Sequence, residues 1–104
     1  MAVISVTEKN FENEVLNSEK PVLADFYADW CGPCKMLSPV VHEIAEERGD
    51  IKVVSVNVDD EPELAEKYEV YSIPCLVVIK NGEETGRHTG FIPKDAINAL
   101  VGGK

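Results

Sequence analysis

Residues 22–48 read VLADFYADWCGPCKMLSPVVHEIAEER, and this stretch decides the fold. Its first part, Val22–Ala28, is apolar on both parities apart from Asp25, as expected for a strand that is covered on both faces. A loop with Cys31 and Cys34 follows, and apolar residues then recur at helical spacing to the end of the stretch. We therefore expect a buried strand, a loop with two cysteines and a long helix. The buried stripe expected on that helix comprises Met36, Leu37, Val40, Val41, Ile44 and Ala45.

The chain on either side of this stretch alternates between strand and helix patterns. Thr7 can cap a first helix, Pro62 marks the start of a short helix, and Asn81-Gly82 is a strong hairpin signal. We expect strands at Val3–Val6, Val22–Ala28, Ile51–Val58, Leu76–Ile79 and Glu84–Thr89. We expect helices at Glu8–Asn17, from the second cysteine to about Arg48, from Pro62 to about Glu69, and from Pro93 onward with Ala96, Ile97, Leu100 and Val101 on its buried side.

The resulting order, β-α-β-α-β-α-β-β-α, predicts an α/β fold with a central mixed sheet. Alternating strands and helices favour parallel pairs with helices on both faces, and the final hairpin adds an antiparallel edge. The chain has 104 residues and no internal repeat or linker, so we expect a single domain over residues 1–104. In such sheets, sites form where a loop leads from the end of a strand into a helix. Cys31 and Cys34 occupy such a position.

The composition argues against several classes of function. The net charge of −9 gives a surface that repels phosphate backbones and anionic lipids, so we expect neither a nucleic acid nor a membrane partner. Residues 1–7 lack the basic residues and the apolar core of a secretion signal. We therefore expect a cytoplasmic protein, in which stable structural disulfides are rare. Three cysteines is also an odd number, which suits a disulfide framework poorly.

Cys31 and Cys34 are the candidate catalytic residues. Two cysteines at this spacing at a helix start can close a small disulfide ring, and the positive end of the helix dipole favours a thiolate at Cys31. Lys35 adds a positive charge nearby. We expect Cys31 to face outward and to attack a partner disulfide, and Cys34 to lie partly covered one turn further on and to resolve the mixed disulfide.

The residues around the pair fit this chemistry. Gly32 lets a partner backbone approach, Pro33 pre-sets the first helical turn, and Trp30 offers a flat apolar wall beside the thiol. Asp25 interrupts the apolar strand that leads toward the cysteines, and burial there would raise the pKa of its carboxyl. Asp25 is therefore the candidate base for the proton of Cys34.

The six residues Trp30 to Lys35 resemble the active-site motif of the thioredoxin family residue for residue. This match is far more specific than a bare C-x-x-C. The element order and the chain length match as well, so the resemblance covers essentially the whole chain. It implies a thioredoxin-like fold and the reduction of protein disulfides. The other matching positions are Asp25, Phe26, Pro39, Ile73-Pro74, Lys80-Asn81-Gly82 and Gly90.

The resemblance also implies partners and a docking surface. Pro74 would follow a cis peptide bond and lie beside the dithiol, where the extended chain before a proline suits pairing with a substrate backbone. A thioredoxin reductase would recharge the dithiol, and the protein would bind no cofactor of its own. A protein that must expose its active-site surface is expected to be a monomer. The implied apolar patch comprises Trp30, Gly32, Pro33, Ile73, Pro74, Gly90 and Phe91.

Three positions depart from the family pattern. Ser55 stands where thioredoxins often carry a lysine near the buried aspartate, so a raised pKa of Asp25 would depend more on burial. Tyr27 replaces a common tryptophan, which is a mild change. Cys75 replaces the usual threonine after the proline, and we expect this third thiol close to Cys31 and Cys34.

A zinc site is a competing interpretation of the two cysteines. Zinc usually needs four protein ligands, and the chain offers only Cys75, His42 and His88 beyond Cys31 and Cys34. We expect both histidines to be exposed residues rather than ligands, and no metal site.

The roles of Asp25 and Cys75, and whether the protein reduces or oxidises its partners, each allow more than one interpretation. Asp25 could be a buried carboxylate with no part in proton transfer. Cys75 could be a compact buried hydrophobe, or a thiol that exchanges with the active-site disulfide. The chain could also be an oxidase or isomerase, although Gly32-Pro33 favours a reductant. Finally, it could be a binding module that docks partners through Trp30, Ile73 and Phe91 without any redox step.

Overall fold

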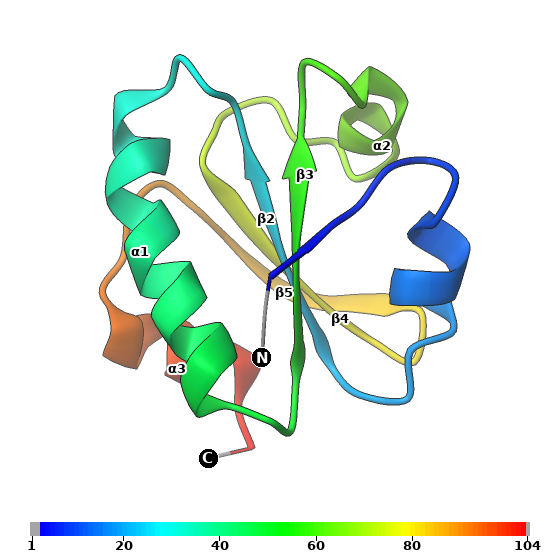
Figure 1. Ribbon diagram of the computed structural model, residues 1–104, viewed down its shortest axis with the longest axis vertical. Coiled ribbons are helices and arrows are strands. Elements are labelled where there is room, and N and C mark those ends of the chain that lie inside the picture. Colours follow the sequence, from blue (N-terminus) through cyan, green and yellow to red (C-terminus); the bar gives the residue numbers. More distant parts are fainter. Residues whose placement is uncertain (1–2, 104) are drawn as a thin grey trace.

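The computed structural model describes residues 3–103 (Figure 1). A five-stranded sheet, in the order β1-β3-β2-β4-β5, forms its centre. This architecture confirms the expected α/β class and mixed sheet. Within the described residues, no helix is both long and apolar enough to cross a membrane. The elements are β1 (Ile4–Ser5), the π-helical turn η1 (Glu12–Leu16), β2 (Val22–Tyr27), α1 (Gly32–Glu47), β3 (Lys52–Asn57), α2 (Pro62–Lys67), β4 (Cys75–Lys80), β5 (Glu83–Thr89) and α3 (Lys94–Val101).

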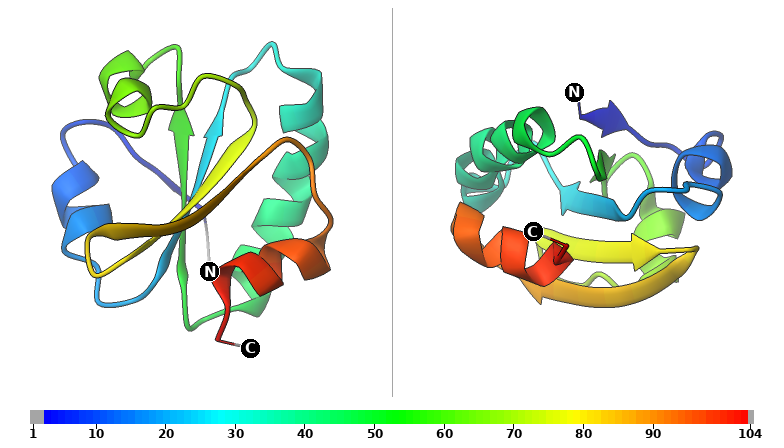
Figure 2. Two further views of the ribbon diagram at one scale, coloured as in Figure 1. Left: turned by 180° about the vertical axis from the view of Figure 1, so that it is seen from behind. Right: turned by 90° about the horizontal axis from the view of Figure 1, so that it is seen from below.

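Helices cover both faces of the sheet, as Figures 1 and 2 show. α1 and α3 pack on one face, and η1 and α2 on the other. β2 supplies both cores, because successive side chains of a strand point to opposite faces. Leu23 packs with α1 and α3, whereas Ala24 and Phe26 pack on the opposite face. By the same alternation, Asp25 points to the face that α1 covers.

The hairpin strands run against the rest of the sheet. β1, β3 and β2 are parallel, whereas β4 is antiparallel to β2 and to β5. β3 ends at Asn57 and β4 begins at Cys75, so residues 58–74 join the two strands. Because β4 is antiparallel to β2, it starts at the end of the sheet where β2 and β3 finish, which is also the end that carries the cysteines.

The turn between β4 and β5 follows the sequence signal. Asn81 and Gly82 both have positive φ, at 54° and 81°, as a two-residue type I′ turn requires. A β-bulge between Val78 and Ile79 shifts the register of the hairpin. β5 forms one free edge of the sheet, and the two-residue β1 forms the other.

Two expectations about helices are wrong. The expected helix Glu8–Asn17 is only the turn η1, in which the backbone N–H of Asn17 bonds the carbonyl of Glu12 five residues earlier. The wider turn still buries Phe11 and Val15 against the sheet. Met36 is 65% exposed rather than part of the buried stripe. Its side chain lies outside the face of α1 that packs on the core, which is formed by Leu37, Val41, Ile44 and Ala45.

Candidate active site

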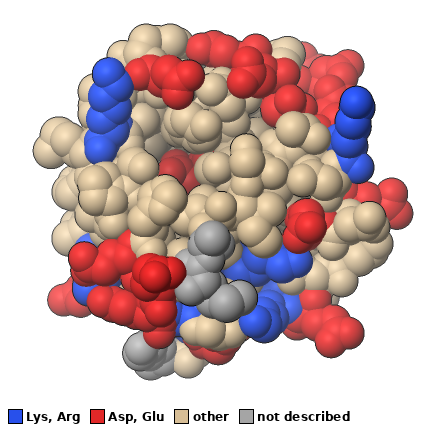
Figure 3. All heavy atoms as spheres, in the orientation of Figure 1, with Lys and Arg blue, Asp and Glu red and all other residues tan. Residues whose placement is uncertain are grey.

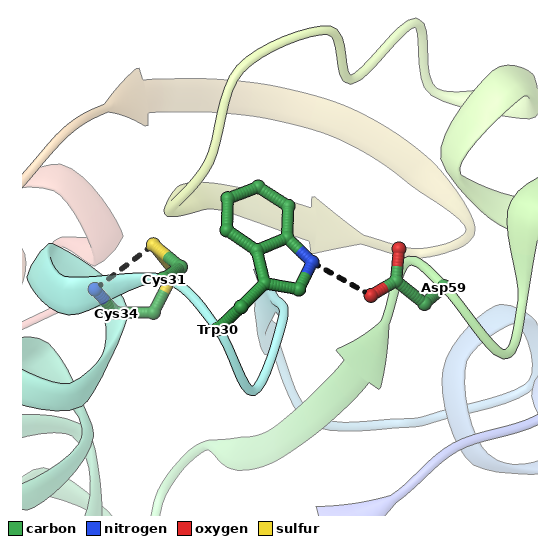
Figure 4. The surroundings of a disulfide bond; sticks show 4 residues. All are labelled: Trp30, Cys31, Cys34 and Asp59. Carbon is green, nitrogen blue, oxygen red and sulfur yellow. Dashed lines mark hydrogen bonds between the residues drawn. A yellow bond between two sulfur atoms is a disulfide. The ribbon is translucent and has the colours of Figure 1, made fainter.

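The two cysteines form a disulfide at the start of α1 (Figure 4). Cys31 is the N-cap residue of α1, and its Cα atom lies 5.2 Å from that of Cys34. The backbone N–H of Cys34 donates a hydrogen bond to Sγ of Cys31 at 3.2 Å. Pro33 has no N–H, and the N–H of Lys35 donates to the carbonyl of Cys31, so Cys34 is the residue of this turn whose N–H reaches the sulfur. This arrangement favours negative charge on the Cys31 sulfur once the disulfide is reduced.

Both cysteines are buried in the disulfide form. Each is only 4% exposed, and they pack with Ala28 and against Ile73. The expectation that Cys31 faces outward is therefore wrong for this state, because Cys31 packs with Ala28 and Cys34 in one buried cluster. Within residues 3–103, no group of three or more His, Cys, Asp or Glu side chains could hold a metal ion.

Trp30 stands beside the disulfide and is 71% exposed. Its indole N–H donates a hydrogen bond of 2.8 Å to Asp59 (Figure 4). Asp59 is itself held by the turn after β3, where the side chain of Asn57 accepts from its backbone N–H. Asp59 lies three residues before Pro62, at which the short helix was expected to start. The two residues are 29 positions apart in the sequence, so no local sequence pattern predicts this hydrogen bond.

The loop before β4 lies next to the disulfide, as the resemblance implies. The Ile73–Pro74 peptide bond is cis, and Ile73 packs against the cluster that contains both cysteines. The backbone N–H of Gly90 donates to the carbonyl of Pro74 at 2.8 Å, which brings the loop after β5 to the same place. Pro74 is buried, whereas Phe91 is 43% exposed. A partner would therefore meet Phe91 and the edge of Ile73 rather than the proline ring.

Gly32 and Pro33 complete the surface on the α1 side. Both are exposed, and a Cβ atom added at Gly32 would meet nothing within 4 Å. No packing within the described chain therefore explains this glycine. Lys35 is also exposed.

Asp25 is a buried carboxyl beside the disulfide. It is 6% exposed, and Oδ1 has no hydrogen-bond partner among the described residues. Burial raises the pKa of Asp25 from 3.8 to about 7. Asp25 and Cys34 line one cavity of about 240 Å³, and Figure 3 shows this face of the molecule hollowed beside α1 with acidic atoms inside. Ser55 is the register partner of Asp25 on β3 and lines the same cavity, so burial alone sets this pKa.

Cys75 packs on the other face of the sheet. It is 1% exposed and belongs to the core cluster of Phe26 and Val77, on the face of the sheet opposite α1. Strand alternation explains this placement, since its neighbour Leu76 takes the α1 face. Cys75 therefore packs in a different cluster from Cys31 and Cys34, although it directly follows Pro74 in the chain. Its packing fits a compact buried hydrophobe.

The two histidines lie on different elements, His42 on α1 and His88 on β5. His42 on α1 is exposed, as expected, but it also lines the cavity beside Asp25. His88 on β5 is half-buried rather than exposed, because its strand packs along β4.

A redox disulfide in the first turn of the helix that follows the central strand defines a dithiol–disulfide oxidoreductase. The sequence model of the family described as Thioredoxin matches residues 2–102. The chain is 48% identical to the thioredoxin of Porphyra purpurea over 97% of this chain and 95% of that protein. It is 49% identical to the thioredoxin of Bacillus subtilis (strain 168), over 97% and 96%. A chloroplastic relative, thioredoxin M5 of Oryza sativa subsp. japonica, is 44% identical over 95% of this chain and 58% of that protein.

The chain therefore belongs to the thioredoxin family. It is a protein disulfide reductase whose active-site pair is a CxxC motif.

Proposed function

We propose that this protein carries electrons from a thioredoxin reductase to protein disulfides, with Cys31 as the attacking thiol and Cys34 as the resolving thiol. The observation that carries the proposal is the hydrogen bond from the Cys34 N–H to Sγ of Cys31 at the start of α1. Only Cys31 is placed to have its thiolate stabilised by the helix start. Cys34 lies within the helix, where it is positioned to attack Cys31.

The exchange proceeds in two balanced steps. The Cys31 thiolate attacks one sulfur of the partner disulfide, so a mixed disulfide forms and one partner thiolate leaves. Cys34 then loses its proton to the Asp25 carboxylate and attacks Sγ of Cys31, which releases the second partner thiolate. The partner gains two electrons and the Cys31–Cys34 pair loses two. The shared cavity and the pKa of about 7 support Asp25 as this base.

Partners dock on the surface around the disulfide in this proposal. Trp30 and Phe91 supply exposed apolar area, and Gly32 leaves room for a partner backbone. The proposed location is the cytoplasm, since a free thiol at Cys75 in the same chain as a redox pair suits a reducing compartment. The protein acts there as a monomer and uses no nucleic acid or membrane partner.

Single cysteine variants test the order of attack. Cys34→Ser is expected to accumulate a stable mixed disulfide through Cys31, and Cys31→Ser is expected to lose all reduction of a disulfide substrate such as insulin. Cys75→Ser is the matched control, and it should retain turnover because Cys75 packs in a separate core cluster. Mass spectrometry of the trapped adducts identifies the attacking residue. An adduct on Cys34 in the Cys31→Ser variant, with turnover retained, would reverse the assignment.

A further inference from the structure

Arg87 on β5 belongs to a polar network that the proposed exchange does not use. Its register partner on β4 is Val77, a residue of the core under η1 and α2, so the guanidinium points to the face of the sheet that α2 covers. The carboxylate of Glu84 accepts two hydrogen bonds from it, from Nε at 2.7 Å and from Nη2 at 2.8 Å. These bonds lower the pKa of Glu84 from its usual value. The paired contact fixes the plane of the guanidinium.

The same guanidinium binds the end of α2. Nη2 of Arg87 donates to the carbonyl of Tyr68, and Nη1 donates to the carbonyl of Glu69 at 3.4 Å. Carbonyls at a helix C-terminus lack partners within the helix, and a cation there also meets the negative end of the helix dipole. Glu69 has a φ of 54°, the left-handed conformation in which a chain leaves a helix. Arg87 therefore holds the point at which α2 continues into the loop of residues 70–74.

The loop of residues 70–74 is held at its other end as well. The backbone N–H of Gly90, which follows β5, donates to the carbonyl of Pro74 at 2.8 Å. Between the two attachments, Tyr71 and Ser72 are exposed, and neither forms a hydrogen bond with the described residues. The path of this segment therefore depends on where its two ends are held.

We propose that Arg87 is a positioning residue for docking: it holds the loop of residues 70–74 in the conformation that presents Ile73 and Tyr71 to a partner protein beside the disulfide. The inference rests on the proposed docking of partners on the surface around the disulfide. Ile73 packs against the cluster that contains the disulfide, and Tyr71, two residues earlier, is 82% exposed. Two residues of extended chain span about 7 Å, so Tyr71 contacts a partner side chain near the attacked disulfide.

An ordered loop gives this protein a preference for protein disulfides over small ones. A loop that is already held in place loses less conformational entropy when a partner docks on it. Removal of the Arg87 guanidinium should therefore slow reaction with protein disulfides, whereas a small disulfide reaches the sulfur without using the loop. A merely structural role would change the amount of folded protein and would leave the preference of the folded molecules unchanged.

Single-turnover oxidation of the reduced protein measures this preference. Trp30 is the only tryptophan of the chain, so its fluorescence can follow the reaction with insulin and with hydroxyethyl disulfide. Arg87→Met is expected to lower the second-order rate constant for insulin about fivefold, the effect of ordering roughly one residue, and to leave that for hydroxyethyl disulfide within about twofold. Lys67→Met is the matched control, because it removes one positive charge from the last turn of α2, and both of its rate constants should be unmodified.

Limited proteolysis measures the loop directly. Tyr71 is an exposed aromatic residue in a loop, so chymotrypsin can cleave after it, and cleavage after Trp30 in the same sample is the reference. Arg87→Met is expected to speed cleavage after Tyr71 about fivefold relative to cleavage after Trp30. Lys67→Met should leave both cleavage rates unchanged. Mass spectrometry of the fragments identifies each site.

The ratio of the insulin rate constant to the hydroxyethyl disulfide rate constant decides the outcome. An Arg87→Met variant with the unmodified ratio, or with unmodified cleavage after Tyr71, overturns the positioning role. Arg87→Lys should also lower the ratio, since an ammonium lacks the planar fork that reaches both carbonyls; an unmodified ratio there would assign the effect to charge alone and overturn the geometric role. Phe91→Ser separates the two proposals. A normal ratio in Phe91→Ser removes the docking surface itself, whereas a low ratio there with a normal Arg87→Met removes only the positioning role.

Discussion

Replacing Asp25 by asparagine is expected to stabilise the disulfide form of the protein, and to do so more at high pH. The pKa of Asp25 is about 7 in the folded protein and 3.8 as its ordinary value. The folded state therefore binds the proton more tightly, and the free energy of unfolding falls as pH rises from about 4 to about 7. One pKa unit is worth about 1.4 kcal/mol, so the ionised carboxylate costs about 4 kcal/mol above pH 7. Asparagine fills the same space and carries no charge.

The pH dependence is the useful quantity, because the fixed cost of burying an amide is the same at both pH values. At pH 5 the folded carboxyl is still protonated, and its raised pKa lowers the free energy of unfolding by about 1.5 kcal/mol. At pH 8 the carboxyl is ionised, and the free energy of unfolding is lower by about 4 kcal/mol. Urea unfolding should therefore show that the stabilisation by Asp25→Asn grows by about 2 to 3 kcal/mol between pH 5 and pH 8. Asp29→Asn is the matched control at an exposed site. Growth of less than about 1 kcal/mol would refute the view that burial controls this carboxyl.

Two further predictions concern residues outside the active site. Cys75 is 1% exposed, so iodoacetamide should modify Cys31 in the reduced native protein and reach Cys75 only after unfolding; peptide mapping that finds Cys75 modified at the rate of Cys31 would contradict its placement. Gly82→Ala should lower the free energy of unfolding by about 1 to 2 kcal/mol, because Gly82 has a φ of 81° that an L-residue adopts at a cost. Gly49→Ala is its control, since a Cβ there meets nothing within 4 Å, and equal losses in urea unfolding would argue against backbone strain.

Much of the fold follows from local patterns in the sequence. Val22–Tyr27 is apolar on both parities and became the central strand, and Asn81-Gly82 formed the turn that its sequence indicates. The first helix was predicted wrongly, because the spacing of Phe11 and Val15 suits both a regular helix and the wider turn that packing selects. The direction of β4 depends on the path that residues 58–74 take between β3 and β4, and no local pattern in the sequence specifies that path.

The site was predictable where chemistry is local and unpredictable where it depends on tertiary contacts. The spacing of Cys31 and Cys34 predicts that they belong to the site, and Asp25 is predicted because it interrupts an apolar strand. The hydrogen bond between Trp30 and Asp59 joins distant segments, and nothing in either segment predicts the other. The side of the sheet that Cys75 faces depends on strand register, so a shift of one residue would have reversed the prediction.

The two free edges of the sheet affect whether copies of this protein associate with one another at high concentration. β1 offers only two residues, and β5 carries Glu83, Glu84 and Arg87 with a bulge in its pairing to β4. Short, charged or bulged edges are poor templates for adding another strand, and a net charge of −9 makes copies repel each other. In the proposed function, association with other proteins occurs instead through the apolar surface around the disulfide. An electron carrier with such edges can leave one apolar surface exposed to its partner proteins without aggregating with its own copies.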